Sequence, residues 1–284
     1  MHWIRWSTGL ALVALVGAGR PVWSQSSRNH LYDKLQLDLS GAAVILGSNV
    51  RVDGSNGNGT DLDAEDQLGL AKTKFQPRAA IRWRPGRRHH LELGYQMARR
   101  TAEKTLDRDI IFADSTYPVG LAVNSKFDTD QAFLTYRFAF MAHDRTQIGV
   151  GIGLGALFFK IGIDALAAAG SQQVTFSRAK DFIGPTASLG LFGNFRLSDR
   201  WYLESDLRAM KVSIDRIDAS VWEANLAGRY FLSDKVGLEA GYGISWLELK
   251  IASKTDGNGL IGLDASGKIK YYLQNLRLGV VVTL

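Results

Sequence analysis

Histidine is the side chain that most often serves as a general base near neutral pH, so the histidines are the first candidates for chemistry. The chain has 284 residues, with five histidines and no cysteine. The lack of cysteine excludes disulfide bonds, thiolate metal sites and a cysteine nucleophile. Serines and aspartates are present, but without a neighbouring base they form no catalytic triad. The histidines are His2, His30, His89, His90 and His143.

An acidic segment is the second candidate. Asp61, Asp63 and Glu65 stand at alternate positions, as they do at the start of a calcium-binding loop. The pattern then departs from that loop, because Asp66 replaces the required glycine and Lys72 replaces the final glutamate. We therefore interpret the segment as a solvated acidic loop and expect no metal and no cofactor.

The N-terminus is typical of a secretory signal peptide. A positively charged stretch precedes a short apolar run over residues 10–16, and Val22 and Ser24 are small enough for the cleavage positions. The apolar run is too short for an anchor helix, which needs roughly 20 apolar residues. We predict a signal peptide over residues 1–24 and a single domain over residues 25–284.

After the signal peptide the dominant pattern is alternation of apolar residues with polar or small ones. Within residues 187–197, for example, Leu189 and Leu191 fall on one face, and Ser188 and Asn194 fall on the other. Successive side chains of a strand point to opposite faces, so each such segment predicts a strand with one apolar side. Ten segments follow the pattern: 35–46, 79–84, 90–98, 131–140, 147–157, 187–197, 201–210, 221–232, 236–246 and 270–284.

The connections between these segments differ in length. The short ones are 84–89, 142–146, 197–200 and 232–235, and the long ones are 48–73, 102–126, 163–184, 212–220 and 252–267. Short turns at one end and long loops at the other are typical of outer-membrane barrels, in which the short turns are periplasmic. We predict an all-β fold: a transmembrane antiparallel up-and-down β-barrel of ten strands. Eight or twelve strands remain alternatives if a loop hairpin is miscounted.

The apolar faces are predicted to meet lipid, with a soluble lipocalin-like barrel as the alternative. Aromatic residues gather beside the short turns, and Trp222, Tyr242 and Trp246 are candidates for the opposite interfacial girdle. The final strand is amphipathic and resembles the assembly signal of bacterial outer-membrane proteins. We therefore expect outer-membrane localisation, with outer-membrane lipid, lipopolysaccharide, periplasmic chaperones and the barrel assembly machinery as partners. The formal net charge of +6 comes from scattered residues, so no nucleic-acid partner is expected.

The polar faces carry charges that should line the lumen. Six acids balance six bases, which favours a lumen largely filled by ion pairs over a strongly selective pore. The function predicted from this is a structural or passive small-solute channel role. The alternative is a surface receptor or adhesin that acts through loops 48–73 and 102–126. The predicted lumen charges are Asp38, Arg82, Glu92, Arg137, Arg196, Glu204, Asp206, Arg208, Glu223, Arg229, Glu239 and Arg277.

The same topology argues against catalysis. Barrel enzymes such as omptin proteases, lipid A deacylases and outer-membrane phospholipases use a histidine near the extracellular rim or outer leaflet. Here His2 leaves with the signal peptide, and His30, His89, His90 and His143 lie at or beside the predicted periplasmic end. We predict that the protein is not an enzyme.

Three stretches carry a resemblance to a group of uncharacterised proteobacterial outer-membrane β-barrel proteins, which are small porin-like barrels. They are the acidic segment 59–70, the run 82–84 with 89–92, and the run 105–110 with 117–120. The resemblance covers roughly residues 55–140. It implies the location and the fold, and it transfers no catalytic or binding residue.

Overall fold

The computed structural model describes residues 28–169, 172–214, 217–252 and 266–284. The predicted signal peptide, residues 1–24, lies outside the described residues. Ten long strands dominate the described chain: β1 (Leu35–Asp53), β3 (Thr73–Trp83), β4 (His89–Thr105), β7 (Ala122–His143), β8 (Thr146–Ala169), β9 (Gln172–Arg196), β10 (Trp201–Ile214), β11 (Ile217–Phe231), β12 (Val236–Ile251) and β13 (Ser266–Thr283).

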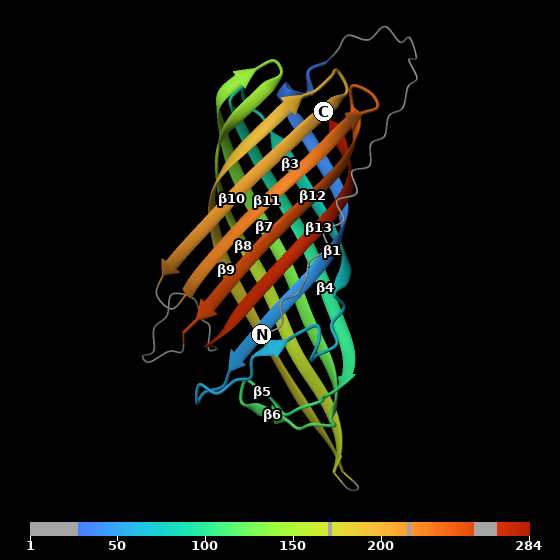
Figure 1. Cartoon of the computed structure of the whole chain (residues 1–284), viewed down its shortest axis with the longest axis vertical. Coiled ribbons are helices and arrows are strands. Elements are labelled where there is room, and N and C mark those ends of the chain that lie inside the picture. The colour runs from blue at the N-terminus through green and yellow to red at the C-terminus, as the bar shows by residue number, and fades with distance from the viewer. Residues whose placement is uncertain (1–27, 170–171, 215–216, 253–265) are drawn as a thin grey trace, which may run out of the picture.

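These ten strands form one closed antiparallel ring (Figure 1). Strands that follow one another in the sequence pair with one another, and β1 also pairs with β13, from Gln36 opposite Thr283 to Asp53 opposite Ser266. The short turns and the C-terminus lie at the top of Figure 1, and the longer connections lie at the bottom. The predicted ten-stranded, all-β, up-and-down barrel is confirmed. In the described part of the chain, no helix is long and apolar enough to cross a membrane.

Strand β1 shows how polarity is distributed along the wall. Near the short turns, Leu39 faces outward and is half exposed, while Asp38 faces inward and is buried. Farther along, the pattern reverses: Asn49 is exposed on the outside, and Val50 is buried inside. A strand in lipid needs an apolar outer face, whereas a strand in water needs an apolar inner face. The lower part of β1 therefore has the polarity of a membrane barrel, and the upper part has that of a soluble one.

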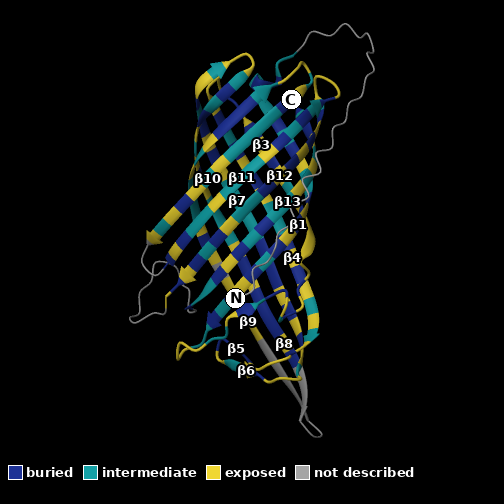
Figure 2. Cartoon of the chain, in the orientation of Figure 1, coloured by how far each residue is buried: buried dark blue, intermediate teal, exposed yellow. Residues whose placement is uncertain are grey.

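The other long strands show the same reversal, which appears as changing bands in Figure 2. In β8, Ile152 is exposed on the outside and is followed on that face by the exposed Lys160. The inner face of β8 changes from Gly153 to Ile163, which is fully buried. In β12 the outer face changes from Trp246 to the exposed Lys250. The barrel therefore extends beyond its lipid-facing belt on the side of the long connections.

The height of the belt agrees with a bilayer. The outward apolar stretch of β1 runs from Leu35 to Ile45. At about 3.3 Å per residue and a tilt of about 40°, such a stretch of about eleven residues spans roughly 28 Å. The apolar band of outer-membrane barrels is about 25 Å tall.

The reversal also corrects two of the predicted loops. Residues 163–184 and 212–220 are mostly strand, because β8 ends at Ala169, β9 begins at Gln172, β10 ends at Ile214 and β11 begins at Ile217. Alternation continues through these segments, but the apolar residues change from the outer to the inner face. The change produces a run such as Leu157-Phe158-Phe159, which interrupts the pattern expected for a lipid-facing strand.

The upper lumen is filled by an apolar core. Inward side chains of the strands meet side chains of the long connections there, including Leu62 on β2 (Leu62–Asp63) and Leu68, which are nearly inaccessible. The predicted hairpin around residues 110–117 exists as β5 (Ile110–Phe112) and β6 (Ser115–Tyr117). It packs into this core, because Ile110, Phe112 and Tyr117 are buried. The hairpin thus closes the upper mouth, and the lumen is not filled by ion pairs along its whole length.

A buried ion pair holds one connection inside the barrel. The guanidinium of Arg100 on β4 pairs with the carboxylate of Glu65 and donates a hydrogen bond of 2.7 Å to the hydroxyl of Ser48. The backbone N–H of Ser48 donates a hydrogen bond of 2.7 Å to the other carboxylate oxygen of Glu65. This arrangement attaches the connection between β1 and β3 to two strands at once.

The segment before β1 closes the opposite end. It contains a short 3-10 helix, η1 (His30–Tyr32), whose Leu31 packs in a small buried cluster with Tyr202, Phe231 and Val281. The imidazole of His30 stacks on the Phe231 ring with their centroids 3.5 Å apart. We call residues 28–33 the lower plug.

Lipid exposure of the belt predicts a position-dependent cost of charge. Leu226 lies in the belt of β11 and is half exposed, whereas Ser220 lies on the same outer face beyond Trp222. We expect Leu226→Arg to lower the free energy of unfolding in bilayers by about 2–4 kcal/mol, because the charge meets acyl chains. We expect Ser220→Arg, the matched control, to change it by less than about 1 kcal/mol. Denaturant titration in lipid vesicles measures both, and equal losses would contradict the reversal of polarity.

Candidate functional site

Below the apolar core, the lumen contains a layer of paired charges. Eleven side chains join into one connected set of ion pairs that draws on nine of the ten long strands. We call this set the charge layer. Its members are Asp38, Arg78, Arg82, Glu92, Arg137, Glu204, Asp206, Arg208, Arg229, Glu239 and Arg277. All of them stand at inward positions of their strands, which is why the cylinder brings them together.

Two arginines organise one half of the charge layer. Arg229 lies 2.7 Å from Glu239, 2.9 Å from Glu204 and 3.2 Å from Asp38, measured between the nearest nitrogen and oxygen atoms. Arg82 lies 3.1 Å from Glu204 and 3.4 Å from Asp38. Both guanidinium groups therefore share the same two carboxylates. The exposed fraction of each of these two arginine side chains is 5% or less, so each charge depends on its partners rather than on bulk water.

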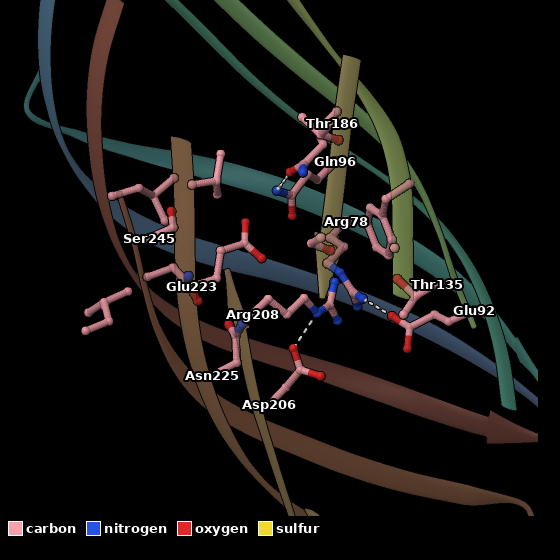
Figure 3. A pocket seen from close by; sticks show the side chains of 18 of the residues that line it. Arg78, Glu92, Gln96, Thr135, Thr186, Asp206, Arg208, Glu223, Asn225 and Ser245 are labelled. Carbon is pink, nitrogen blue, oxygen red and sulfur yellow. Dashed lines mark hydrogen bonds and ion pairs between the residues drawn. The ribbon is translucent and has the colours of Figure 1, made fainter. Parts of the chain in front are cut away.

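Glu92 organises the other half of the charge layer. Its carboxylate lies 2.7 Å from Arg78, 3.3 Å from Arg82 and 3.4 Å from Arg137. Arg137 in turn reaches Asp206 at 3.3 Å, and Asp206 also pairs with Arg208. Figure 3 shows Arg78 bound to Glu92 and Arg208 bound to Asp206, with their side chains directed toward the centre of the lumen.

Most of the predicted lumen charges belong to the charge layer, with two exceptions. Glu223 faces the same space, yet no ion pair or hydrogen bond joins it to another described residue. Arg196 was placed wrongly: it pairs with Asp199 at 2.8 Å, at the short turn after β9, because it is the last residue of its strand. Arg78 was missed because the strand was predicted to begin at residue 79, although Arg78 shares the inward face of Arg82.

A cavity of about 190 Å³ separates the charge layer from the apolar core. Its lining is polar where it meets Arg208, Glu223 and Asn225, and apolar where it meets Met210 and Leu247. Figure 3 shows Glu223, Gln96 and Ser245 around this space.

The histidines lie at the end of the barrel that carries the short turns. His89 and His90 begin β4, His143 ends β7, and His30 belongs to the lower plug. Among the described residues, no recorded hydrogen bond joins a histidine ring to a serine. The His89 ring meets the hydroxyl of Tyr136 at 2.7 Å, and both ring nitrogens of the buried His90 lack a hydrogen-bond partner.

The remaining histidine stabilises the lower plug. Its Nδ1 atom lies 2.7 Å from Oδ2 of Asp33, which also accepts a hydrogen bond of 3.1 Å from Thr283. Burial acts to raise the pKa of Asp33, but the hydrogen bond and charge of His30 outweigh it and leave the pKa below its usual value. The carboxylate is therefore ionised at neutral pH, and the stability it contributes is lost only as the solution becomes strongly acidic.

The acidic loop shows no arrangement for a metal ion. Within the described ranges, no group of three or more histidine, aspartate or glutamate side chains is placed to hold one. Asp63 instead accepts hydrogen bonds from the backbone N–H groups of Glu65 and Asp66, while Glu65 turns inward to Arg100. The predicted solvated loop is thus partly a structural turn.

Comparison with known proteins connects the fold to solved structures only. No family model and no curated protein matches the sequence. The outer-membrane protease OmpT of Escherichia coli has a similar structure, with a TM-score of 0.54 and 9% sequence identity over 89% of this chain and 97% of that one. At this identity the similarity shows the barrel fold and nothing about activity.

Two other solved barrels are more distant. The toluene transporter TodX of P. putida has a TM-score of 0.34 and 9% identity, and the match covers 89% of this chain and 90% of that one. The attachment invasion locus protein Ail of Yersinia pestis has a TM-score of 0.32 and 10% identity, with 86% of this chain and 99% of that one covered.

The charge layer predicts a large loss of stability when one member is removed. We expect Arg229→Ala to lower the free energy of unfolding by about 3–5 kcal/mol, because it leaves the carboxylates of Asp38 and Glu239 buried with fewer partners. Lys72→Ala is the control, since Lys72 pairs with Asp66 on the surface, where water screens the charges. Denaturant unfolding in detergent micelles measures both variants. Equal stability of the two would show that the charge layer is hydrated and contributes little.

Proposed function

We propose that this chain is an integral β-barrel of the bacterial outer membrane, exported by a cleaved signal peptide, with a structural role and a lumen that does not conduct. The observation that carries the proposal is the filling of the lumen at three levels. The lower plug, the charge layer and the apolar core follow one another along the barrel axis. A passive channel would need a continuous water-filled path, and these three levels oppose it.

The orientation follows from the same features. Outer-membrane barrels turn their short connections to the periplasm and their longer ones to the outside. The wall beyond the belt then projects from the cell, and its outward polar residues suit contact with water and with the sugars of lipopolysaccharide. Periplasmic chaperones and the barrel assembly machinery are the partners expected during biogenesis, because the chain ends in an amphipathic strand.

A surface receptor or adhesin role is the second candidate, and the length of the strands favours it. Strands β8 and β9 extend farthest beyond the belt (Figure 1). Much of the predicted contact loops 48–73 and 102–126 faces inward, because Leu62, Leu106 and Phe112 are buried. A partner would therefore meet the outer wall of the projecting strands, together with exposed loop residues such as Asn56 and Val119.

A catalytic role is disfavoured by the position of the histidines. All four described histidines lie at the short-turn end, which the proposed orientation places in the periplasm. Similarity to a protease barrel does not change this, because 9% identity carries no catalytic residue across. We therefore propose that the protein is not an enzyme.

Conductance tests the closed lumen. We expect mature protein refolded into planar bilayers to produce no steady channels, because plug, charge layer and core all obstruct the path. An open porin inserted in the same bilayer is the positive control. Stable current steps from the wild-type protein would overturn the structural role and favour passive transport.

Tag accessibility on intact cells tests the orientation. We expect an epitope inserted after Asn56, in the exposed connection that follows β1, to bind antibody on intact cells. An epitope inserted after Asp234, in the short turn between β11 and β12, should bind only after the outer membrane is permeabilised. Labelling in the opposite order would invert the proposed topology and return the histidines to the cell surface.

A further inference from the structure

The cavity between the charge layer and the apolar core has the size of a small ligand site. Its volume is about 190 Å³. For comparison, an engineered apolar cavity of about 150 Å³ in another protein binds benzene. The space inside this barrel therefore accommodates one aromatic ring with a short substituent.

Small residues on the inner wall create this space. Ser245 on β12 stands opposite Glu223 on β11, and the next inward residue of β12 toward the short turns is Gly243. A side chain at Gly243 would collide with Asn225 and Asn275, which flank it on the neighbouring strands. Large side chains are thus absent on one side of Glu223, and the volume beside its carboxylate stays open.

Glu223 is the unpaired charge of the cavity. Every arginine of the charge layer lies within 4.0 Å of at least one carboxylate. Glu223 faces Arg208 across the β10–β11 pair, but Arg208 is bound to Asp206 and makes no ion pair with Glu223. Among the described residues, Glu223 has neither an ion pair nor a hydrogen bond. A ligand that enters the cavity therefore meets one uncompensated negative group.

Apolar side chains lie directly beside that group. The next inward row toward the apolar core contains Met210 on β10, Val221 on β11 and Leu247 on β12, which are register neighbours. All three line the cavity. A carboxylate at the edge of an apolar wall is complementary to a molecule with one cationic and one apolar end.

We propose that this cavity binds a small amphipathic organic cation, such as a primary arylalkylamine. The ammonium group pairs with Glu223 and the apolar part rests on Met210, Val221 and Leu247. An anion is disfavoured because the guanidinium groups around the cavity already have carboxylate partners. A metal ion is disfavoured because Glu223 supplies a single carboxylate, and no metal-binding group occurs among the described residues. The proposal does not depend on the proposed structural role.

The direct test uses fluorine NMR of 4-fluorobenzylamine with the full mature protein. Because the lumen is obstructed at both ends, the probe is present while the protein refolds in a neutral detergent, and excess probe is then removed by dialysis. Two probes of similar size serve as ligand controls, namely neutral 4-fluorobenzyl alcohol and anionic 4-fluorobenzoate. We expect one bound amine per barrel, with the alcohol retained at least about tenfold less, since a charged hydrogen bond is worth about 1.5–3 kcal/mol.

Three variants separate the site from general binding. We expect Glu223→Gln to lower retention of the amine by about tenfold or more. Glu248→Gln on the outer wall of β12 is the matched control and should retain the amine, because Glu248 pairs with Lys250 and Lys268 outside the lumen. Ser245→Phe fills the cavity with the carboxylate intact and should abolish retention. The heat-dependent gel shift and circular dichroism establish that each variant has folded.

Each other outcome overturns the proposal. Equal retention of amine and alcohol, or equal retention by wild type and Glu223→Gln, would show an apolar cavity without a role for the carboxylate. No retention of any probe by the folded wild type would show a cavity filled by water alone. If Glu223→Gln does not fold, the loss of amine in Ser245→Phe, compared with Glu248→Gln, decides the question.

Discussion

Closure of the backbone hydrogen-bond ladder is the constraint on which this structure depends. A strand in lipid has no water to satisfy its N–H and C=O groups, so every strand needs a partner on both sides. The pairing of β1 with β13 meets this requirement over nearly the whole length of both strands. Once the ring is closed, alternate side chains must point into a narrow cylinder, and the content of that cylinder becomes the second problem that the fold has to solve.

The chain fills the cylinder differently at different heights. At the level of the belt the outer face is apolar, so the inner face carries the polar residues, and charges buried there persist only in pairs. Beyond the belt the outer face meets water and the inner face becomes apolar, as Lys160 and Ile163 show on β8. One chain thus combines a membrane barrel and a soluble barrel, which share a single set of strands.

The filling of the lumen also bears on function. A barrel closed below by η1 and above by β5 and β6 resembles a scaffold more than a pore, although its fold is shared with a protease. The space that remains is small, lies between two chemically different layers and contains Glu223, a carboxylate that the charge layer does not pair. Such a place is where a closed barrel retains the capacity to bind something.

The sequence by itself determined the class of fold, the number of strands and the inward position of most lumen charges. Period-two alternation is a local property, so Leu189 and Asp38 could be assigned to opposite faces without knowledge of any partner strand. The sequence reading failed where neighbours in space decide. Arg78 was missed because the start of β3 depends on pairing with β1, and Arg196 was misplaced because its strand ends at the turn that holds Asp199.

Only the tertiary structure decided which charges pair and what fills the upper lumen. Arg229 and Asp38 are far apart in the sequence and meet because the ring closes between β1 and β13. Leu62, Leu68 and Phe112 lie in connections that look like surface loops, yet they are buried, because the apolar inner face beyond the belt needs partners. The isolation of Glu223 likewise follows from the register of β10, β11 and β12, which no segment specifies alone.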